Sequence, residues 1–278
     1  MVDFLQHDPE GMEREAAQLM GKPGYEDFML SNESDTADEK ETPPGYEAKA
    51  ALREALVGNR GLARQQARAE LALSNDRAVE AVSAMALGLA GDSTEALRLA
   101  SGLSQRFPKD TIVQSAYSPM IRAVAILGGG NASQDASKAI DALAAAAPYE
   151  LGNVALTLGL ALYPVYVRAE AHLAAHQGAA AAAEFQKILD HPGVALNDLI
   201  GALAHLGLGR AYALQAGVGA GLVPAQSGRP QGAPLQTDAL AKTRTAYQDF
   251  FTLWKDADPD IPILKQAKAE YARLGDTM

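Results

Sequence analysis

The chain contains no cysteine. This absence excludes disulfides, thiol nucleophiles and zinc sites with cysteine ligands, and it leaves the redox compartment open. Aromatic residues make up only 6% of the sequence although 48% of it is hydrophobic, because alanine dominates the apolar fraction. No window keeps the strict alternation of polar and apolar residues that is typical of a half-buried strand. The composition therefore favours closely packed helices over sheets.

Membrane-spanning runs and an excess of basic charge are also missing. The uncharged run Leu151–Val167 has 17 residues and contains Asn153 and Pro164, whereas a membrane helix needs roughly 20 apolar residues. We therefore expect no membrane insertion, and the N-terminus shows no basic-then-apolar signal. The formal net charge is −10 and the pI about 5.0. An acidic chain repels phosphate backbones, so we expect no nucleic-acid partner.

What the sequence does contain is a series of helix pairs with apolar residues at helical spacing. Hinges are expected at Gly58, at Gly91, at Gly128–Gly130 and at Gln177-Gly178. A pair of this kind cannot bury its own apolar face and has to stack on neighbours like itself. The predicted pairs are 45–57 with 60–73, 76–89 with 94–106, 111–127 with 134–146, the two helices within 166–189, and 198–216 with 239–254.

The two ends of the chain depart from this regular pattern. Residues 1–44 predict helices over 9–20 and from Tyr25 to about Leu30, followed by a polar stretch, and we interpret them as an irregular N-terminal remnant of the array. The stretch 217–237, rich in Gly, Pro, Gln and Ser, predicts a flexible excursion. A capping helix is expected over 259–274. Its predicted apolar stripe is Leu264, Ala267, Tyr271 and Leu274. Its outward residues are predicted to be Lys265, Lys268, Glu270 and Arg273. Residues 45–278 would then form one continuous domain.

The pattern resembles the tetratricopeptide repeat (TPR). The unit length is about 34 residues, and the motifs are Leu208-Gly209-x-x-Tyr212, Ala181-x-x-x-Phe185 and the closing prolines Pro108 and Pro148. The chain departs from the consensus because no unit has the usual early Trp, and Thr243 stands where an Ala is expected. The resemblance implies an all-α fold, a right-handed α-solenoid of antiparallel helix pairs (TPR superhelix) with a C-terminal capping helix.

The wording of the C-terminal third, for example TAYQDFFTLWKDADPDIPILKQAKAEYARL, is similar to the TPR region of large bacterial proteins, many of them acidobacterial. In those proteins the array follows a serine/threonine protein kinase domain or a winged-helix regulator. The resemblance implies a sensory or scaffolding arm. The kinase itself is not in this sequence, which has no glycine-rich loop, HRD or DFG motif.

Candidate chemical motifs are incomplete. His172 and His176 have the spacing of two metal ligands, but the HExxH pattern and a third ligand are missing, so we interpret them as structural. Gly128–Gly130 is not followed by the Gly-Lys-Ser/Thr of a phosphate-binding loop. The alternating aspartates at 256, 258 and 260 lack the glycine and glutamate of a calcium loop. The sequence predicts no enzyme, no cofactor and no metal site.

The sequence supports a binding surface better than it supports any of these chemical sites. In stacked helix pairs the first helices line a concave groove, where the pattern places Tyr163, Tyr166, Glu170 and Arg210. The two tyrosines are three residues apart and share a helix face, and aromatic residues and arginine dominate interface hot spots. Alternatively, the tyrosines are seam residues whose hydroxyls reach water. We expect a protein or peptide partner that presents an internal segment or a folded surface.

Two hypotheses on function follow from the sequence. The first is a protein–protein interaction or scaffolding module, the sensory or regulatory arm of a larger bacterial signalling protein. The second is a small-molecule or lipid sensor that uses the low-charge tract 151–167 and an apolar groove beside it. The chain is expected to be soluble, on the cytoplasmic or periplasmic side of a bacterial membrane. The sequence leaves the partner, the oligomeric state and the compartment open.

Overall fold

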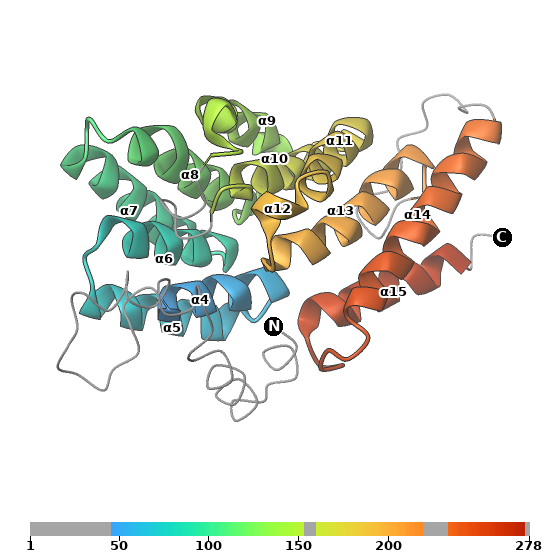
Figure 1. The fold of residues 1–278 in the computed structure, drawn as a ribbon, viewed down its shortest axis with the longest axis horizontal. Coiled ribbons are helices and arrows are strands. Elements are labelled where there is room, and N and C mark those ends of the chain that lie inside the picture. Colours follow the sequence, from blue (N-terminus) through green and yellow to red (C-terminus); the bar gives the residue numbers. More distant parts are fainter. Residues whose placement is uncertain (1–45, 153–159, 219–232, 276–278) are drawn as a thin grey trace.

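The computed structural model describes residues 46–152, 160–218 and 233–275, and every element in these ranges is a helix (Figure 1). Two of the elements are not α-helical: η1 is a π-helix and η2 a 3-10 helix. The bounds are α4 Tyr46–Val57, α5 Arg60–Leu73, α6 Arg77–Leu89, α7 Ser93–Arg106, η1 Val113–Tyr117, α8 Ser118–Leu127, α9 Ala132–Ala142, η2 Leu143–Tyr149, α10 Tyr163–Ala174, α11 Gly178–Leu189, α12 Pro192–Ala195, α13 Leu199–Gln215, α14 Ala233–Leu253 and α15 Pro262–Gly275.

Glycine hinges and aspartate caps set the bounds of the first two helix pairs. Gly58 follows α4 with a φ of 93°, and Gly91 follows α6 with a φ of 87°, a region that other residues adopt at a cost. Asp76 accepts hydrogen bonds from two backbone amides at the start of α6, and Asp92 accepts one at the start of α7, as helix N-caps do. The predicted pairs 45–57/60–73 and 76–89/94–106 are confirmed to within a residue at each end.

The third pair differs from its prediction at both outer ends. The expected helix over 111–127 is interrupted after Ile112 by the π-helix η1 and continues as the α-helix α8 from Ser118. The expected helix over 134–146 stops being α-helical at Ala142, and the chain continues as the 3-10 helix η2, which contains Pro148. Proline has no amide hydrogen and clashes with the carbonyl four residues earlier, so an α-helix cannot run through it without a kink.

Three elements near the C-terminus, α12, α14 and α15, differ from the prediction. α14 begins at Ala233 rather than at 239, so the end of the expected excursion 217–237 is helical. The short helix α12 was not predicted. The capping helix, expected over 259–274, begins at Pro262 as α15. The helices predicted at 9–20 and 25–30, with the rest of the remnant 1–44, lie outside the described residues, as does 219–232.

The helices form a closed series of packed neighbours. α4 packs on α6, α6 on α8, α8 on α10 and α10 on α13, while α5, α7, α9, α11 and α14 each pack on the preceding helix of their pair. α15 packs on α14 and also on α4, so the last described helix returns to the first one (Figure 1). At this junction a Cβ added to Gly58 would lie 3.0 Å from the Cβ of Pro262.

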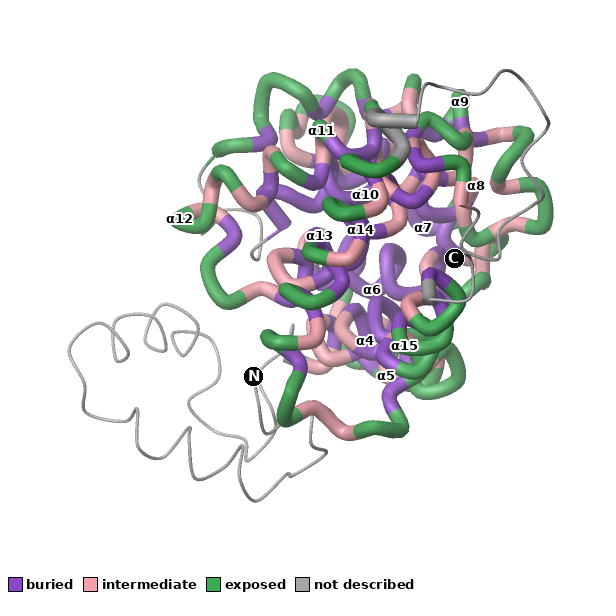
Figure 2. The backbone as a smooth tube through the Cα atoms, turned by 90° about the vertical axis from the view of Figure 1, so that its right-hand side faces the viewer, coloured by how far each residue is buried: buried purple, intermediate pink, exposed green. Residues whose placement is uncertain are grey.

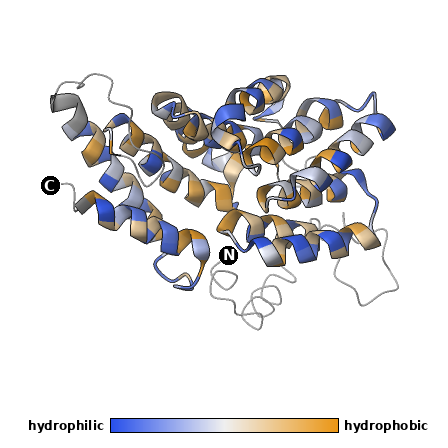
Figure 3. Cartoon of the chain, turned by 180° about the vertical axis from the view of Figure 1, so that it is seen from behind, coloured by the Kyte–Doolittle hydropathy of each residue, from blue (hydrophilic) through white to orange (hydrophobic). Residues whose placement is uncertain are grey.

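Small residues allow the helices to approach closely, as the alanine-rich sequence predicted. A Cβ on Gly128 would lie 2.2 Å from the carbonyl oxygen of Gly88, so the backbones after α8 and within α6 are in direct contact. Buried residues gather in the middle of the molecule (Figure 2), and hydrophobic and hydrophilic residues alternate along the helices (Figure 3). The described residues are therefore an all-helical array of packed neighbours. No helix within them is both long enough and apolar enough to cross a bilayer.

Candidate functional site

The four residues predicted to line a groove lie on α10 and α13, and the structure places them inside the array. The side chains of Tyr163 and Tyr166 are buried, with 3% and 8% of their surface exposed. Glu170 is partly buried on the same helix, and the Arg210 side chain is 14% exposed on α13. They divide into two polar clusters, one around Tyr163 and one around Arg210.

In the first cluster, Tyr163 joins α10 to the start of α13. Its hydroxyl donates a hydrogen bond to Oδ1 of Asp198 at 3.0 Å, and Asp198 also accepts from the backbone amide of Ile200 at 3.1 Å. Burial raises the pKa of Asp198, although these hydrogen bonds and the charges of Lys49 and Arg53 on α4 favour its ionised form. Burial is likewise the main cause that lowers the pKa of Lys49. This cluster joins α10 to the start of α13 and lies close to the positive charges of α4.

The second cluster has an ion pair at its centre. Arg210 donates from Nε to Oε2 of Glu270 at 3.0 Å and from Nη2 to Oε1 at 3.1 Å. The hydroxyl of Tyr247 on α14 donates to the same Oε2 at 2.8 Å. A guanidinium that grips a carboxylate with two parallel donors is among the stronger and more specific polar contacts in proteins. The cluster therefore fixes α15 against both helices of the preceding pair.

The prediction that Glu270 faces outward is wrong. Only 3% of Glu270 is exposed, because the carboxylate is occupied by Arg210 and Tyr247. The periodic signal was available in the sequence, since Glu270 follows Ala267 by three residues and therefore shares the face of the predicted apolar stripe. The charge of Glu270 favours the opposite placement, because a charged side chain is rarely buried unless it is paired. The other three residues predicted to face outward, Lys265, Lys268 and Arg273, are exposed.

Glu170 lies beside the ion pair of Arg210 and Glu270, and its carboxylate has a less complete set of interaction partners than that of Glu270. Burial raises the pKa of Glu170 above its usual range, the Arg210 charge and the Tyr166 hydroxyl oppose this shift, and the charge of Glu270 adds to it. Burial also raises the pKa of Tyr166, whose ring packs edge-on against Phe185 at a centroid distance of 6.0 Å. The carboxylates of Glu170 and Glu270 thus both interact with the positive charge of the Arg210 guanidinium.

We expect Glu170→Gln to stabilise the chain at neutral pH relative to the wild type. A raised pKa means that the folded state binds the proton more tightly than the unfolded state, so ionisation at higher pH lowers stability. The difference in the free energy of unfolding should vanish below about pH 4, where both states are protonated, and grow as the pH rises. Urea denaturation between pH 4 and 8 measures it. Glu47→Gln on α4, outside the cluster, controls for the loss of one charge, and a pH-independent difference would contradict the assignment.

A second group of charges, not predicted from the sequence, ties η2 to α10 and α11. Arg168 donates to Glu150 and, through Nε and Nη2, to Glu184 at 2.9 and 2.6 Å. Lys187 donates to the other oxygen of Glu150 at 2.5 Å. Burial by itself would raise the pKa of Glu150, but the hydrogen bonds from Arg168 and Lys187 outweigh it and the pKa is lowered. Each of these four charged side chains is paired with an opposite charge inside the cluster. We therefore interpret the cluster as structural.

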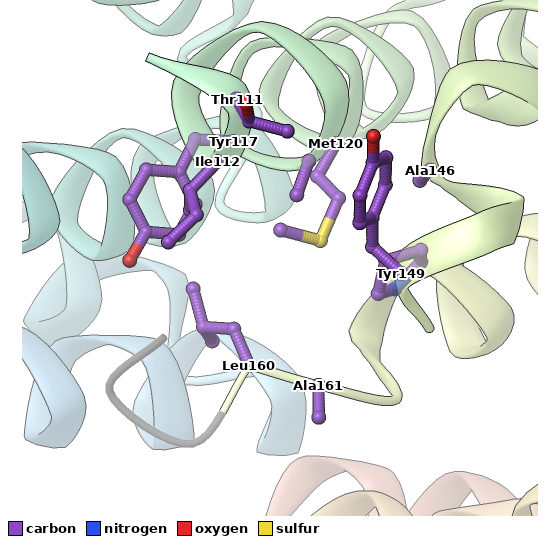
Figure 4. Close-up of a pocket in the computed structure, with 10 residues that line it drawn as sticks. Thr111, Ile112, Tyr117, Met120, Ala146, Tyr149, Leu160 and Ala161 are labelled. Atoms are coloured by element: carbon purple, nitrogen blue, oxygen red, sulfur yellow. The ribbon is translucent and has the colours of Figure 1, made fainter. Parts of the chain in front are cut away.

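An apolar cavity of about 50 Å³ lies where η1, α8 and η2 meet the start of α10 (Figure 4). Burial raises the pKa of Tyr117, one of its walls, to about 12. Tyr149, on the opposite side, is 49% exposed. π-helical turns such as η1 are frequent at functional sites. The cavity is lined by Thr111, Ile112, Ala116, Tyr117, Met120, Ala146, Tyr149, Leu160, Ala161 and Pro164.

The histidine pair does not form part of a ligand set. Nδ1 of His172 lies 2.6 Å from Oε1 of Gln177, and His176 is an exposed residue with a φ of 56° in the turn between α10 and α11. In residues 46–152, 160–218 and 233–275, no group of three or more His, Cys, Asp or Glu side chains could hold a metal ion.

Comparison with known proteins gives no match to a family model and no match to a curated protein. The function must therefore be argued from the residues and contacts described above.

Proposed function

We infer that the chain is a protein–protein interaction or scaffolding module. We further infer that its packed helices form a right-handed α-solenoid of antiparallel pairs, of the tetratricopeptide type, with α15 as the C-terminal cap. Support comes from the contacts of alternate helices along the chain, from the glycine hinges and from the repeat motifs in the sequence. Arrays of this kind present extended surfaces to other polypeptides. Catalysis, a cofactor and a metal are not part of the proposal.

The observation that carries the proposal is the way the array holds α15. Arg210 and Tyr247 bind the carboxylate of an amphipathic helix whose apolar stripe packs on the neighbouring helices. Binding of an amphipathic helix along a groove is one of the recurring modes of peptide recognition. Tyrosine and arginine are also the residue types that contribute most to interface hot spots. The array therefore already binds one amphipathic helix of its own chain, and we propose that it binds helices of other proteins in the same way.

The wider role follows from the sequence resemblance alone. We propose that the chain acts as a sensory or regulatory arm of a larger bacterial signalling protein, in the cytoplasm or on the periplasmic side of the membrane. Its partner is a protein or a peptide, and neither nucleic acid nor membrane insertion is involved.

The cavity favours a second candidate, a sensor of a small apolar molecule. Three of its lining residues, Leu160, Ala161 and Pro164, belong to the low-charge tract 151–167 that suggested this function. Its volume of about 50 Å³ is well below the roughly 150 Å³ of a cavity that holds benzene, and further below the 300–1,000 Å³ that is usual for ligand pockets. A lipid would not fit, so this candidate ranks second and is restricted to very small ligands.

One experiment separates the two candidates. The full chain is immobilised and exposed to lysate of the source organism, and retained polypeptides are identified by mass spectrometry against a heat-unfolded sample of the same chain. In parallel, native mass spectrometry of the purified chain measures any bound small molecule. A polypeptide retained only by the folded chain is the expected result. A stoichiometric small-molecule adduct without a retained polypeptide would instead establish the sensor, and the interaction module would be rejected.

A further inference from the structure

The surface beneath α15 consists of Gly58 after α4, Arg210 of α13, and Tyr247 and Phe251 of α14, and is called here the terminal-helix seat. Pro262 at the start of α15 lies against Gly58, and Glu270 near its end lies against Arg210 and Tyr247. The Tyr271 ring completes the contact, with centroids 5.8 Å from Tyr247 and 5.6 Å from Phe251.

The seat recognises a carboxylate with three donors. Arg210 supplies two and the Tyr247 hydroxyl supplies the third, and all three converge on Glu270. A fourth donor comes from α15 itself, where Nε2 of Gln266 lies 2.9 Å from Oε1 of the same carboxylate. Buried ion pairs usually add less stability than well-packed apolar groups of the same size, and their best-attested role is to fix register and partner choice. The ion pair thus makes the seat selective for a helix that presents a carboxylate on its apolar face.

The occupant is defined by more than its charge. The buried side of α15 consists of Leu264, Ala267, Glu270 and Leu274, and its opposite side, including Lys265 and Lys268, is exposed. Ala267 has no exposed surface, so a larger residue at this position would meet the seat. A helix that fits must therefore carry the pattern Leu-x-x-Ala-x-x-Glu-x-x-x-Leu.

We propose that the terminal-helix seat is a binding site for an amphipathic helix of a partner protein that carries one glutamate on its apolar face, and that α15 occupies the seat until such a helix displaces it. This proposal rests on the proposed function and names the chemistry of its partner. The partner helix presents a carboxylate to Arg210 and Tyr247, three residues after a small residue and six residues after a leucine.

Displacement of α15 withdraws Leu264, Ala267 and Leu274 from the core cluster. α15 is connected to α14 through residues 254–261, and its helix contacts are with α14 and α4 in addition to the ion pair with α13. Elements at the end of an array, with one face in solvent, belong to the regions that open most readily. When α15 leaves, the donors of Arg210 and Tyr247 lose Glu270 as their acceptor and become available to another carboxylate.

The test uses a fluorescent peptide that reproduces residues 258–275, added to the full chain and followed by anisotropy. In the wild-type chain the tethered α15 competes at a high effective concentration, so binding is weak. Glu270→Gln in the chain weakens this competitor. We expect that chain to bind the peptide at least about tenfold more tightly than the wild-type chain does, a change that corresponds to about 1.4 kcal/mol.

Two matched variants show whether the seat is responsible. Adding Arg210→Met to the Glu270→Gln chain removes the guanidinium and should weaken peptide binding at least about tenfold, and Glu270→Gln in the peptide should do the same. Lys268→Ala in the chain changes an exposed residue of α15 and should bind the peptide as the wild type does. Equal affinity of the Glu270→Gln and wild-type chains would overturn the proposal, because α15 would then be a permanent part of the fold.

Hydrogen exchange on the wild-type chain gives a second test that needs no variant. The amides of α15 should exchange through an opening that leaves those of α13 protected, and equal protection of the two helices would overturn the proposal. Sedimentation of the Glu270→Gln chain checks the choice of occupant. A dimer that forms with rising concentration would show that a second copy supplies the helix, which contradicts a partner protein.

The two proposals fail in different ways. If the folded chain retains a polypeptide from lysate that the peptide does not displace, the interaction module stands and the seat is not its site. If the peptide binds the seat as expected but lysate yields no specific polypeptide, exchange of α15 at the seat is established, whereas the proposed function is rejected, and with it a partner protein as the occupant.

Discussion

Glu270→Ala should lower the free energy of unfolding by about 3–5 kcal/mol, the cost of breaking a buried ion pair by removing one partner. The substitution leaves the Arg210 guanidinium and the Tyr247 hydroxyl without the acceptor that they bind at 2.8–3.1 Å. Urea denaturation followed by circular dichroism measures the change. The slope of the transition must be compared between variants, because a lower slope would indicate that α15 unfolds separately from the rest.

Two controls establish the cause of this effect. Lys268→Ala removes an exposed charge from the same helix and should change stability by no more than about 0.5 kcal/mol. The double variant Arg210→Met/Glu270→Met replaces the pair with apolar side chains and should cost clearly less than Glu270→Ala, because neither member of the pair is left buried without the other. Glu170 loses the Arg210 charge in this variant, but burial already raises its pKa and favours its neutral form. A loss below about 1 kcal/mol for Glu270→Ala would show that the pair is solvated in solution and does not hold α15.

Gly207→Ala should destabilise the chain by roughly 1–3 kcal/mol, the usual cost of overpacking a core. The added Cβ would lie 2.3 Å from Cζ of Phe185 and 2.5 Å from both Cε atoms. Phe185 has no exposed surface and packs edge-on against Tyr166, so its ring cannot move aside without disturbing α10. The contact between α11 and α13 would have to widen.

Gly201→Ala on the same helix is the matched control. A Cβ at this position would meet no atom within 4 Å, and alanine is favoured over glycine in a helix by about 0.5–1 kcal/mol. The two substitutions are chemically identical but should change the melting temperature in opposite directions. If both stabilise the chain, the close approach of Gly207 to Phe185 does not exist in solution.

Much of the fold could be predicted from the sequence because its signals are local. Helix periodicity, aspartate caps and hinge glycines act within a few residues, and they predicted the first two helix pairs to within a residue at each end. The errors arose where two local signals compete. The apolar pattern extends through residues 143–146, but Pro148 turns this segment into a 3-10 helix. At 233–237 the proline and glutamine content suggested a loop, although α14 already begins at Ala233.

The candidate site could be predicted only in part. Helical spacing grouped Tyr163, Tyr166 and Glu170 on one helix, and the structure places Arg210 close to Glu170 and Tyr166. That these residues line a binding groove stays a prediction. The same reasoning could not show that these side chains are covered. Nor could it find Glu270, because whether a carboxylate is buried depends on a partner that lies 60 residues away in the sequence.

By itself the sequence determined that this protein is built of stacked helices, where most of them begin and end, and that alanine and glycine allow them to pack closely. The tertiary structure alone decided that α15 returns to α4 and that Glu270 meets Arg210 and Tyr247. The reason is geometric. Periodicity fixes which face of a helix is apolar, but the position of the last helix relative to the first is the sum of the small rotations between all the pairs that separate them. No single segment of the sequence encodes that sum.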